Sequence, residues 1–406
     1  MGNPKAHTIL FLSSAFKGER MIEAVKSAGM NIILITDEEN RHQPWPHHHI
    51  DEYFVLHDLR RYQDVIHSVS FLCRGRVIHH IIPLDEFEVE LAAVLREHLR
   101  LHGMTISEVR PFRDKLAMRQ VTQAAGIAVP NFIGVLNYDA LRDFVEKTPA
   151  PWVLKPRMEA GAMGIRKMLD AEGVWRALDE LGDQQSYYLL EKFVPGDVFH
   201  VDALTVNGEI IFNSVQKYGA PPLHVYQGGG VFNSRILPHD SADTVALIAE
   251  NKRVIKALGL VDGVTHGEFI KAHEDGQYYF LEIAARVGGA FLSDMIEQAT
   301  NINLWREWAR LEIGKLRGQA YVLPEVRGDY GGILVTLAKQ QYPDLSAYND
   351  PEVVWRVDKP YHAVLVVVSP DAARVEALVG QYVERFVQDF STSAAAMGAT
   401  RTGQTG

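Results

Sequence analysis

The sequence predicts a protein of mixed α/β and α+β class, in which an open parallel α/β domain precedes antiparallel strands and a small C-terminal α+β block. The first part of this prediction rests on a buried strand pattern at Thr8–Ser14, a helical pattern at about Gly18–Ala28 and a second strand at Asn31–Ile35. This order is typical of parallel strands joined by a right-handed crossover. The second part rests on the alternating runs Val198–Thr205 and Glu209–Val215, which a glycine turn joins as antiparallel strands.

Composition narrows the class of protein. A chain of 406 residues is long enough for two or three domains, and 47% hydrophobic with 23% charged residues is ordinary for a globular protein. The net charge of −10 and the pI near 5.9 argue against a general nucleic-acid binder. Cys73 is the single cysteine, which fits a reducing, cytoplasmic location. We expect no membrane span, because no apolar segment is long enough to cross a bilayer.

The strands of the N-terminal domain end in small polar or acidic residues. In an open α/β sheet, ligands bind at the carboxyl ends of the strands. Ser13, Asp37 and Asp85 are therefore expected to line a crevice. A nicotinamide site is not expected there, because no glycine-rich dinucleotide fingerprint follows the first strand.

A lysine and a glycine-rich loop follow in the middle of the chain. Trp152–Lys155 is predicted to be a strand, Met158–Gly164 a small-residue loop and Ile165–Met168 the next strand. Glycines let backbone N–H groups approach phosphate oxygens, and the lysine adds a positive charge. A mobile hairpin loop is the alternative, since no helix follows the loop as it does in a Walker A motif.

Two acidic residues are predicted to face each other on a hairpin that spans Gly263–Ala290. The turn Glu274-Asp275-Gly276 joins two alternating runs, which can bring Glu268 opposite Glu282 with Arg286 just beyond. Paired carboxylates repel each other unless a cation lies between them, and hard oxygen ligands beside an arginine suit Mg²⁺ and a polyphosphate. The alternative is a surface hairpin whose charges are solvated.

The order of these features along the chain resembles that of the ATP-grasp superfamily. The features are the open α/β domain, a helix with Lys115, the strand with Lys155 and its glycine loop, the run Glu191-Lys192-Phe193-Val194, and the set Glu268, Glu282 and Arg286. The resemblance is to its carboxylate–amine ligases, which include L-amino-acid (dipeptide) ligases and biotin carboxylase-like enzymes, and it covers about residues 1–316. It implies a pre-ATP-grasp domain at 1–112, a small lobe at 113–190, a large lobe with the Mg-ATP site at 191–316, a C-terminal α+β subdomain at 317–390 and a tail at 391–406. The tail is predicted to be disordered because it lacks large apolar side chains.

The resemblance also implies roles for individual residues. Lys115 and Lys155 would bind the ATP phosphates, beneath a loop at 159–164 that contains Gly161 and Gly164. Glu191, Lys192, Phe193 and Val194 would surround the adenine. Glu268 and Glu282 would hold Mg²⁺, or Mn²⁺. Arg286, with Lys155, would act on the transferred phosphoryl group as the catalytic cations, and Gly288 and Gly289 would offer N–H groups to a carboxylate.

The sequence departs from the family pattern at two positions. Ala284 stands where many members have an asparagine that adds a metal ligand. Val198 stands where a glutamate commonly binds the ribose, which leaves Asp197 or His200 as substitutes. For His200, a strand histidine paired with a neighbour is the alternative.

The function implied is ATP-dependent ligation. A small-molecule carboxylate would become an acyl phosphate and then react with an amine, with release of ADP and phosphate. The loops at 159–164 and 218–230 are candidate lids, and Lys217 and Arg235 are candidate carboxylate-binding residues, with exposed strand-end charges as the alternative. A homodimer is the expected assembly. The alternatives are a bicarbonate-using carboxylase and a nucleotide-binding regulatory protein without turnover.

Overall fold

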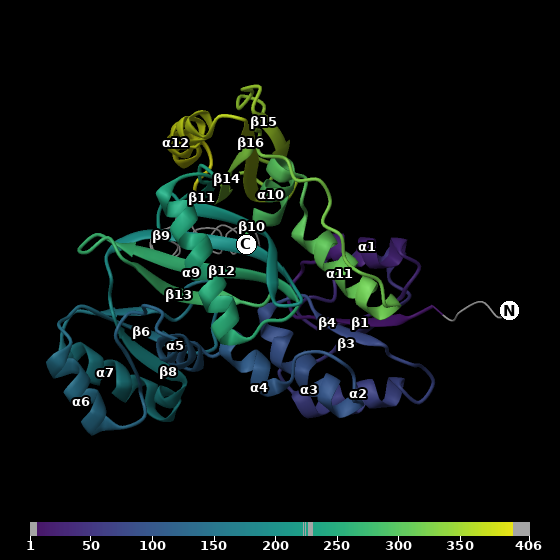
Figure 1. The fold of residues 1–406 in the computed structure, drawn as a ribbon, viewed down its shortest axis with the longest axis horizontal. Helices are drawn as coiled ribbons and strands as arrows, with labels where there is room; N and C mark the ends of the chain where they lie inside the picture. Colours follow the sequence, from purple (N-terminus) through teal and green to yellow (C-terminus); the bar gives the residue numbers. More distant parts are fainter. Residues whose placement is uncertain (1–5, 222, 224, 226–229, 393–406) are drawn as a thin grey trace, which may run out of the picture.

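The computed structural model describes residues 6–221, 223, 225 and 230–392. Its strands form three sheets of four, eight and four strands in this part of the chain. Figure 1 shows that the N-terminal domain and the lobe that contains α6 and α7 lie on the same side of the large central sheet. The predicted mixed α/β and α+β class is confirmed. The tail predicted to be disordered falls almost wholly outside the described residues.

The N-terminal domain is the predicted parallel sheet, with strand order β3-β2-β1-β4. Its elements are β1 (Thr8–Ser13), α1 (Glu19–Ser27), β2 (Asn31–Asp37), η1 (His47–His49), β3 (Glu52–Leu56), α2 (Tyr62–Leu72), β4 (His80–Pro83), η2 (Glu86–Glu88), α3 (Val89–Leu99), α4 (Ile106–Val109) and η3 (Arg110–Phe112). Alternate residues of β1 enter different cores. Ile9 and Phe11 pack with α1, whereas Leu10 and Leu12 pack with α2 and α3.

The strand β3 and the helix α2 were not predicted from the sequence. Every residue of β3 is only partly buried, because the strand lies at the edge of the sheet. It therefore lacks the continuous apolar run that marks β1 and β2.

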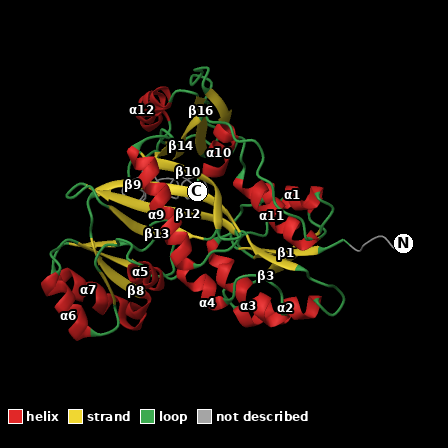
Figure 2. Ribbon diagram, viewed as in Figure 1, coloured by secondary structure: helices red, strands yellow, loops and turns green. Residues whose placement is uncertain are grey.

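The second domain is a small lobe with strand order β5-β8-β6-β7, covered by helices (Figure 2). Its elements are α5 (Lys115–Ala124), β5 (Phe132–Gly134), α6 (Tyr138–Lys147), β6 (Trp152–Pro156), β7 (Arg166–Met168), α7 (Ala171–Leu181), η4 (Gly182–Tyr187) and β8 (Tyr188–Lys192). Because β8 pairs with both β5 and β6, the predicted boundary between residues 190 and 191 is misplaced inside this strand.

The large sheet has strand order β13-β12-β9-β10-β11-β14-β16-β15. Its elements are β9 (Gly196–Val206), β10 (Glu209–Tyr218), β11 (Phe232–Ile236), α9 (Ala242–Leu258), β12 (Gly263–Ala272), β13 (Tyr278–Ala284), α10 (Leu292–Thr300), α11 (Leu304–Arg317), β14 (Tyr330–Leu337), β15 (Val353–Arg356), β16 (His362–Ser369) and α12 (Ala372–Asp389).

The C-terminal strands do not form a sheet of their own. Strand β14 pairs antiparallel with β11, so β14, β16 and β15 extend the central sheet. The separate block predicted at 317–390 is therefore structurally continuous with the preceding lobe. Its helix α12 packs on this extension through a core that includes Leu334, Leu365 and Phe386. Among the described residues, no helix is both long and apolar enough to cross a membrane.

Candidate active site

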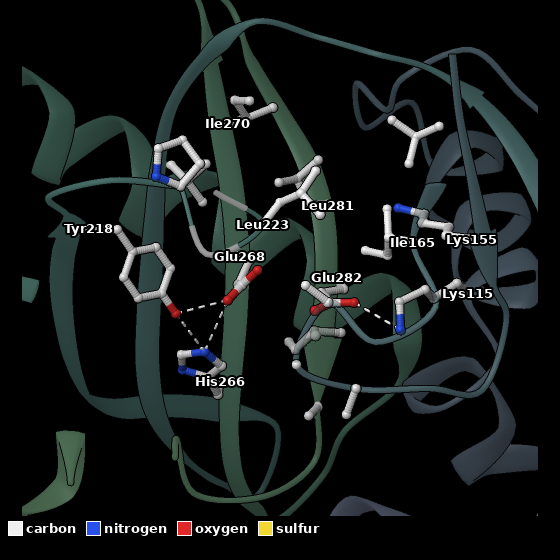
Figure 3. A pocket seen from close by; sticks show the side chains of 18 of the residues that line it. Lys115, Lys155, Ile165, Tyr218, Leu223, His266, Glu268, Ile270, Leu281 and Glu282 are labelled. Carbon is white, nitrogen blue, oxygen red and sulfur yellow. Dashed lines mark hydrogen bonds and ion pairs between the residues drawn. The ribbon is translucent and has the colours of Figure 1, made fainter. Parts of the chain in front are cut away.

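A cavity of about 810 Å³ lies where the small lobe, the large sheet and the N-terminal domain meet. Its lining combines Lys155 and Glu191 from the small lobe, Glu268 and Glu282 from the large sheet, and Glu86 from the N-terminal domain. In Figure 3 the lysines approach from one side and the two glutamates stand on neighbouring strands at the centre. The lysines and glutamates predicted to bind nucleotide and metal thus converge on one space.

The two glutamates lie opposite each other, as the hairpin pattern predicts. Strands β12 and β13 pair antiparallel with Glu268 in register with Glu282, and the turn between them contains Gly276 at a φ of 70°. Burial would raise the pKa of the Glu282 carboxyl, but Lys115 and Lys155 outweigh it and lower this pKa to about 2. The Glu282 side chain is therefore an anion throughout the neutral range.

The two lysines are held in place by the small lobe. Lys115 is the first residue of α5, behind the N-cap Asp114, and its Nζ lies 3.0 Å from Glu282 Oε2. Lys155 lies on β6, where its ammonium pairs with the Glu191 carboxylate. Burial lowers the pKa of Lys155 to about 8, although Glu191 opposes the shift. Both ammonium groups are thus desolvated and matched by carboxylates.

The glycine-rich loop is held by hydrogen bonds from the side chains of Lys115 and Arg113. Lys115 Nζ donates to the Glu159 carbonyl at 2.5 Å, and Arg113 donates to the Met158 carbonyl. Gly161 and Gly164 have φ values of 62° and 69°, which favour glycine. Gly161 lines the cavity, whereas Gly164 does not. The loop therefore lies against the site with its backbone in a conformation that depends on glycine.

The run Glu191–Val194 lines the cavity along the end of β8. The Glu191 side chain does not stand free at an adenine edge, because its carboxylate is buried between Lys155 and Arg119. Lys192, which also lines the cavity, directs its Nζ to the Pro149 carbonyl at 2.8 Å. The Nζ of Lys167 lies 3.9 Å from the centroid of the Phe193 ring.

Arg286 is fixed by the N-terminal domain. Its Nε lies 3.0 Å from Glu86 Oε1, and its Nη1 donates to the Val287 carbonyl at 2.9 Å. Burial alone would lower the pKa of the Arg286 guanidinium, but Glu86 and Asp85 outweigh it and raise this pKa above its usual value. Arg286 is therefore a permanent cation at the cavity wall.

Ser13, Asp37 and Asp85, which were expected to line a crevice of the N-terminal domain, lie outside this cavity. Asp85 pairs with Lys17 at 2.7 Å and lies 3.7 Å from Arg286, so it reaches the site only through that arginine. Ser13 donates to the Ala15 carbonyl, and Asp37 accepts from Asn40. None of these three lines the cavity.

A buried network of hydrogen bonds lies behind Glu268. Tyr218 donates its hydroxyl to Glu268 Oε1 at 2.8 Å, and His266 Nδ1 lies 2.9 Å from Asp202 Oδ1. Burial opposes protonation of His266, but Asp202 and Glu268 outweigh it and raise the pKa of His266 to about 10. Figure 3 shows His266, Tyr218 and Glu268 in mutual contact. The network thus fixes the Glu268 carboxylate.

His200 belongs to this network rather than to the cavity. It is completely buried, with Nδ1 2.7 Å from Asp202 Oδ2 and Nε2 2.8 Å from Ser234 Oγ. The prediction that it could contact a ribose is wrong for this structure, because both ring nitrogens are occupied and no part of it lines the cavity. Donor atoms of His200, Asp202 and His266 lie within 4.8 Å of one another, but the two histidines already share the two Asp202 oxygens.

Asp197, the other ribose candidate, does line the cavity and pairs with Lys217 at 2.8 Å. Arg235 instead pairs with Glu376 and does not line it. Gly289 lines the cavity, whereas Gly288 does not, and a Cβ atom at Gly288 would clash with the side chains of Asp202 and His266. Part of the proposed lid at 218–230, residues 222, 224 and 226–229, lies outside the described residues. Pro221, Leu223 and Val225 from that segment line the cavity.

Several site residues were not identified from the sequence. Glu86, Arg119, Tyr218 and His266 contact the predicted residues from distant parts of the chain. One local signal was available: Arg119 follows Lys115 by four residues on one helix, which places both on the same face. The other contacts depend on the tertiary fold.

Comparisons with known proteins agree with this geometry. A model of the ATP-grasp domain matches residues 148–294. The L-arginine-specific L-amino acid ligase of Bacillus subtilis is 27% identical over 308 residues, which is 74% of this chain and 73% of that protein. The L-amino acid ligase structure from Bacillus licheniformis has a TM-score of 0.73 at 16% identity, over 93% of this chain and 97% of its own. The N5-carboxyaminoimidazole ribonucleotide synthetase structure from Thermus thermophilus has a TM-score of 0.71 at 18% identity, over 95% and 99%.

The small lobe, the large sheet and the N-terminal domain together enclose the cavity. Residues 148–294 match the ATP-grasp domain, and the chain is similar to L-amino acid ligases in sequence and in fold. The resemblance stated from the sequence is confirmed. The matched range spans β6 to the start of α10, which includes Lys155, Glu191, Glu268, Glu282 and Arg286.

Proposed function

We propose that this protein is an ATP-dependent carboxylate–amine ligase, which activates a small-molecule carboxylate as an acyl phosphate and joins it to an amine. The observation that carries the proposal is the convergence of Lys115, Lys155, Glu268, Glu282 and Arg286 on one cavity. The relatives support it, since the L-amino acid ligase of Bacillus subtilis matches most of the chain.

Divalent metal binding fits the residues present. Glu268 and Glu282 lie in register on adjacent strands, both line the cavity, and carboxylate oxygens are the donors Mg²⁺ prefers. Ala284 also lines the cavity and has no donor atom in its side chain. A second metal ion would therefore be held mainly by Glu282 and the nucleotide. When bound, Mg²⁺ or Mn²⁺ would neutralise the ATP phosphates and polarise the transferred phosphoryl group.

The reaction would proceed in two steps. A carboxylate oxygen of the acid attacks the γ-phosphorus, the bond to the bridging oxygen breaks, and ADP leaves with that electron pair. The amine nitrogen then attacks the acyl carbon, phosphate leaves, and the nitrogen gives up a proton. Lys155 and Arg286 would stabilise the negative charge that develops on the phosphoryl oxygens.

The remaining assignments follow from this reaction. The backbone of Lys192 and Val194 would bind the adenine, and Asp197 would face the ribose. The backbone N–H of Gly289 would donate a hydrogen bond to a substrate carboxylate near Arg286. The loop at 159–164 would close over the phosphates, because an acyl phosphate must be kept from water.

A bicarbonate-using carboxylase is the second candidate. The N5-carboxyaminoimidazole ribonucleotide synthetase structure shares the fold, at a TM-score of 0.71. That likeness, at 18% identity, bears on the fold alone. The regulatory alternative depends on Ala284, which removes one potential metal ligand but leaves both glutamates.

The test is ADP and phosphate release by the purified protein with ATP and Mg²⁺, screened against pairs of L-amino acids and against bicarbonate, with products identified by mass spectrometry. We expect ADP release that depends on an amino acid, with a condensation product of matching mass. Release that depends only on bicarbonate would favour the carboxylase. ATP binding without any release would favour the regulatory protein.

We further propose a cytoplasmic homodimer. The cytoplasmic location rests on the single cysteine, Cys73, and the dimer on the frequency of such assemblies among soluble enzymes. Light scattering coupled to gel filtration would give the mass in solution, to be compared with the chain mass of 45.5 kDa.

A further inference from the structure

Arg119 is a buried cation that no part of the proposed reaction uses. It lies on α5 and is completely buried, with Nε 3.2 Å and Nη2 3.1 Å from Glu191 Oε2. Its guanidinium carbon lies 5.8 Å from the centroid of the Phe280 ring. Within the described chain, Nη1 and Nη2 lack a hydrogen-bond partner of good geometry. A buried cation with so few acceptors is costly, so packing alone does not account for it.

Glu191 stands between two cations and uses a different oxygen for each. Its Oε1 pairs with the Lys155 ammonium, and its Oε2 pairs with Arg119. Both partners oppose the burial of Glu191 and hold the pKa of its carboxyl below the usual value. Arg119, Glu191 and Lys155 therefore form a buried row of alternating charge, of which only Glu191 and Lys155 line the cavity.

The sum of these charges matters for what the cavity can bind. Glu191 and Lys155 alone would form a neutral pair, in which the ammonium is committed to the carboxylate. With Arg119 included, the row carries a net charge of about +1, and interactions between charges in such a buried site are stronger than in water. The excess positive charge is then available at Lys155, on the cavity side.

We propose that Arg119 is a positioning residue for nucleotide binding, which neutralises Glu191 so that Lys155 can present its ammonium to the polyphosphate. The inference rests on the proposed function, because it assumes that a nucleotide occupies this cavity. When phosphate oxygens approach Lys155, Glu191 keeps Arg119 as its counter-ion. The buried carboxylate is therefore never left unpaired.

The test is the affinity for ADP with Mg²⁺, measured by isothermal titration calorimetry on the full chain. We expect Arg119→Met to weaken ADP binding about tenfold or more, because Glu191 then retains only Lys155. Arg119→Lys should recover most of the loss, since it restores the charge. The double variant Arg119→Met/Glu191→Gln should lose less than about tenfold in ADP affinity, because it also removes the carboxylate that would otherwise hold Lys155.

Controls separate this inference from the proposed function. Arg142→Met, an exposed arginine of the same lobe that pairs with Asp139, should leave ADP binding unchanged. A wild-type protein that does not bind ADP would contradict the nucleotide site itself. A wild type that binds, with Arg119→Met binding equally well, would contradict the role of Arg119.

The double variant also decides the outcome if Arg119→Met fails to fold, because it removes the buried Glu191 carboxylate that the single variant leaves with Lys155 as its only partner. Binding of ADP within about tenfold of the wild type would support the inference. Binding as weak as that of Arg119→Met, or a loss of more than about tenfold, would overturn it, since Arg119 would then act independently of Glu191.

Discussion

At the scale of single residues, the two central carboxylates have different surroundings. Glu268 accepts the Tyr218 hydroxyl and lies 3.5 Å from His266, so it is fixed from behind by neighbours of its own sheet. Glu282 instead faces Lys115 of the other lobe. The Glu268 carboxylate is thus held in place within its own sheet, whereas the position of Glu282 depends on how the two lobes approach each other.

Glu282→Gln tests the metal assignment. The amide keeps the shape of the side chain but removes the charge that faces Lys115 and would hold the metal. We expect ADP release to fall by at least about a hundredfold, because charge stabilisation at a transferred phosphoryl group is worth several kcal/mol. Steady-state ADP release measures it, with the exposed turn variant Glu274→Gln as the matched control. Full activity in Glu282→Gln would refute the assignment.

At the scale of elements, the glycine loop between β6 and β7 depends on its backbone conformation. Gly164 has a φ of 69°, and a Cβ atom there would lie 2.8 Å from Pro156 Cγ. The loop also accepts hydrogen bonds from Lys115 and Arg113. A side chain at this position would therefore disturb the loop without touching the cavity lining.

Gly164→Ala should raise the KM for ATP several-fold and leave the fold intact. The left-handed conformation costs an alanine about 1 kcal/mol, and the loop must in addition shift away from Pro156. Initial rates over a range of ATP concentrations give the KM. Gly380→Ala serves as the control, because it lies within helix α12 and its Cβ would meet nothing within 4 Å. An unchanged KM would show that this loop does not cover the nucleotide.

The contact between β4 and α11 predicts a pH dependence. His80 Nε2 lies 3.0 Å from Glu312 Oε2, and Trp308 donates to Glu312 at 2.9 Å. Burial would raise the pKa of Glu312, but His80 and Trp308 outweigh it and lower this pKa from 4.5 to about 2. The stabilisation is therefore fully present above pH 4.5 and is lost as the pH falls towards 2.

Glu312→Gln should remove this contribution, which is up to about 3 kcal/mol in the free energy of unfolding. Urea unfolding near pH 6 and near pH 3 would measure it. The wild type should lose stability between these two conditions by more than the variant does. The exposed variant Glu172→Gln should follow the wild type. Equal pH dependence in wild type and Glu312→Gln would contradict the assigned cause.

At the scale of the whole molecule, three bodies meet at the cavity, and each supplies charge to it. Local patterns predicted the parallel N-terminal sheet and the pairing of Glu268 with Glu282, because a hairpin brings together residues that are close in sequence. They could not predict that Arg286 contacts Glu86, 200 residues away, or that His266 contacts Asp202, 64 residues away. The pairing of β14 with β11 is equally non-local, which is why the C-terminal strands were predicted as a separate block.

The ligase reaction makes one claim that can be followed atom by atom: an oxygen of the substrate carboxylate ends in the released phosphate. The measurement uses the amino acid that the ADP-release screen identifies as the acid, the substrate whose carboxylate is activated. This carboxylate is labelled with oxygen-18. The account predicts ADP together with phosphate that carries one labelled oxygen atom. Unlabelled phosphate, or release of AMP and pyrophosphate, would contradict it.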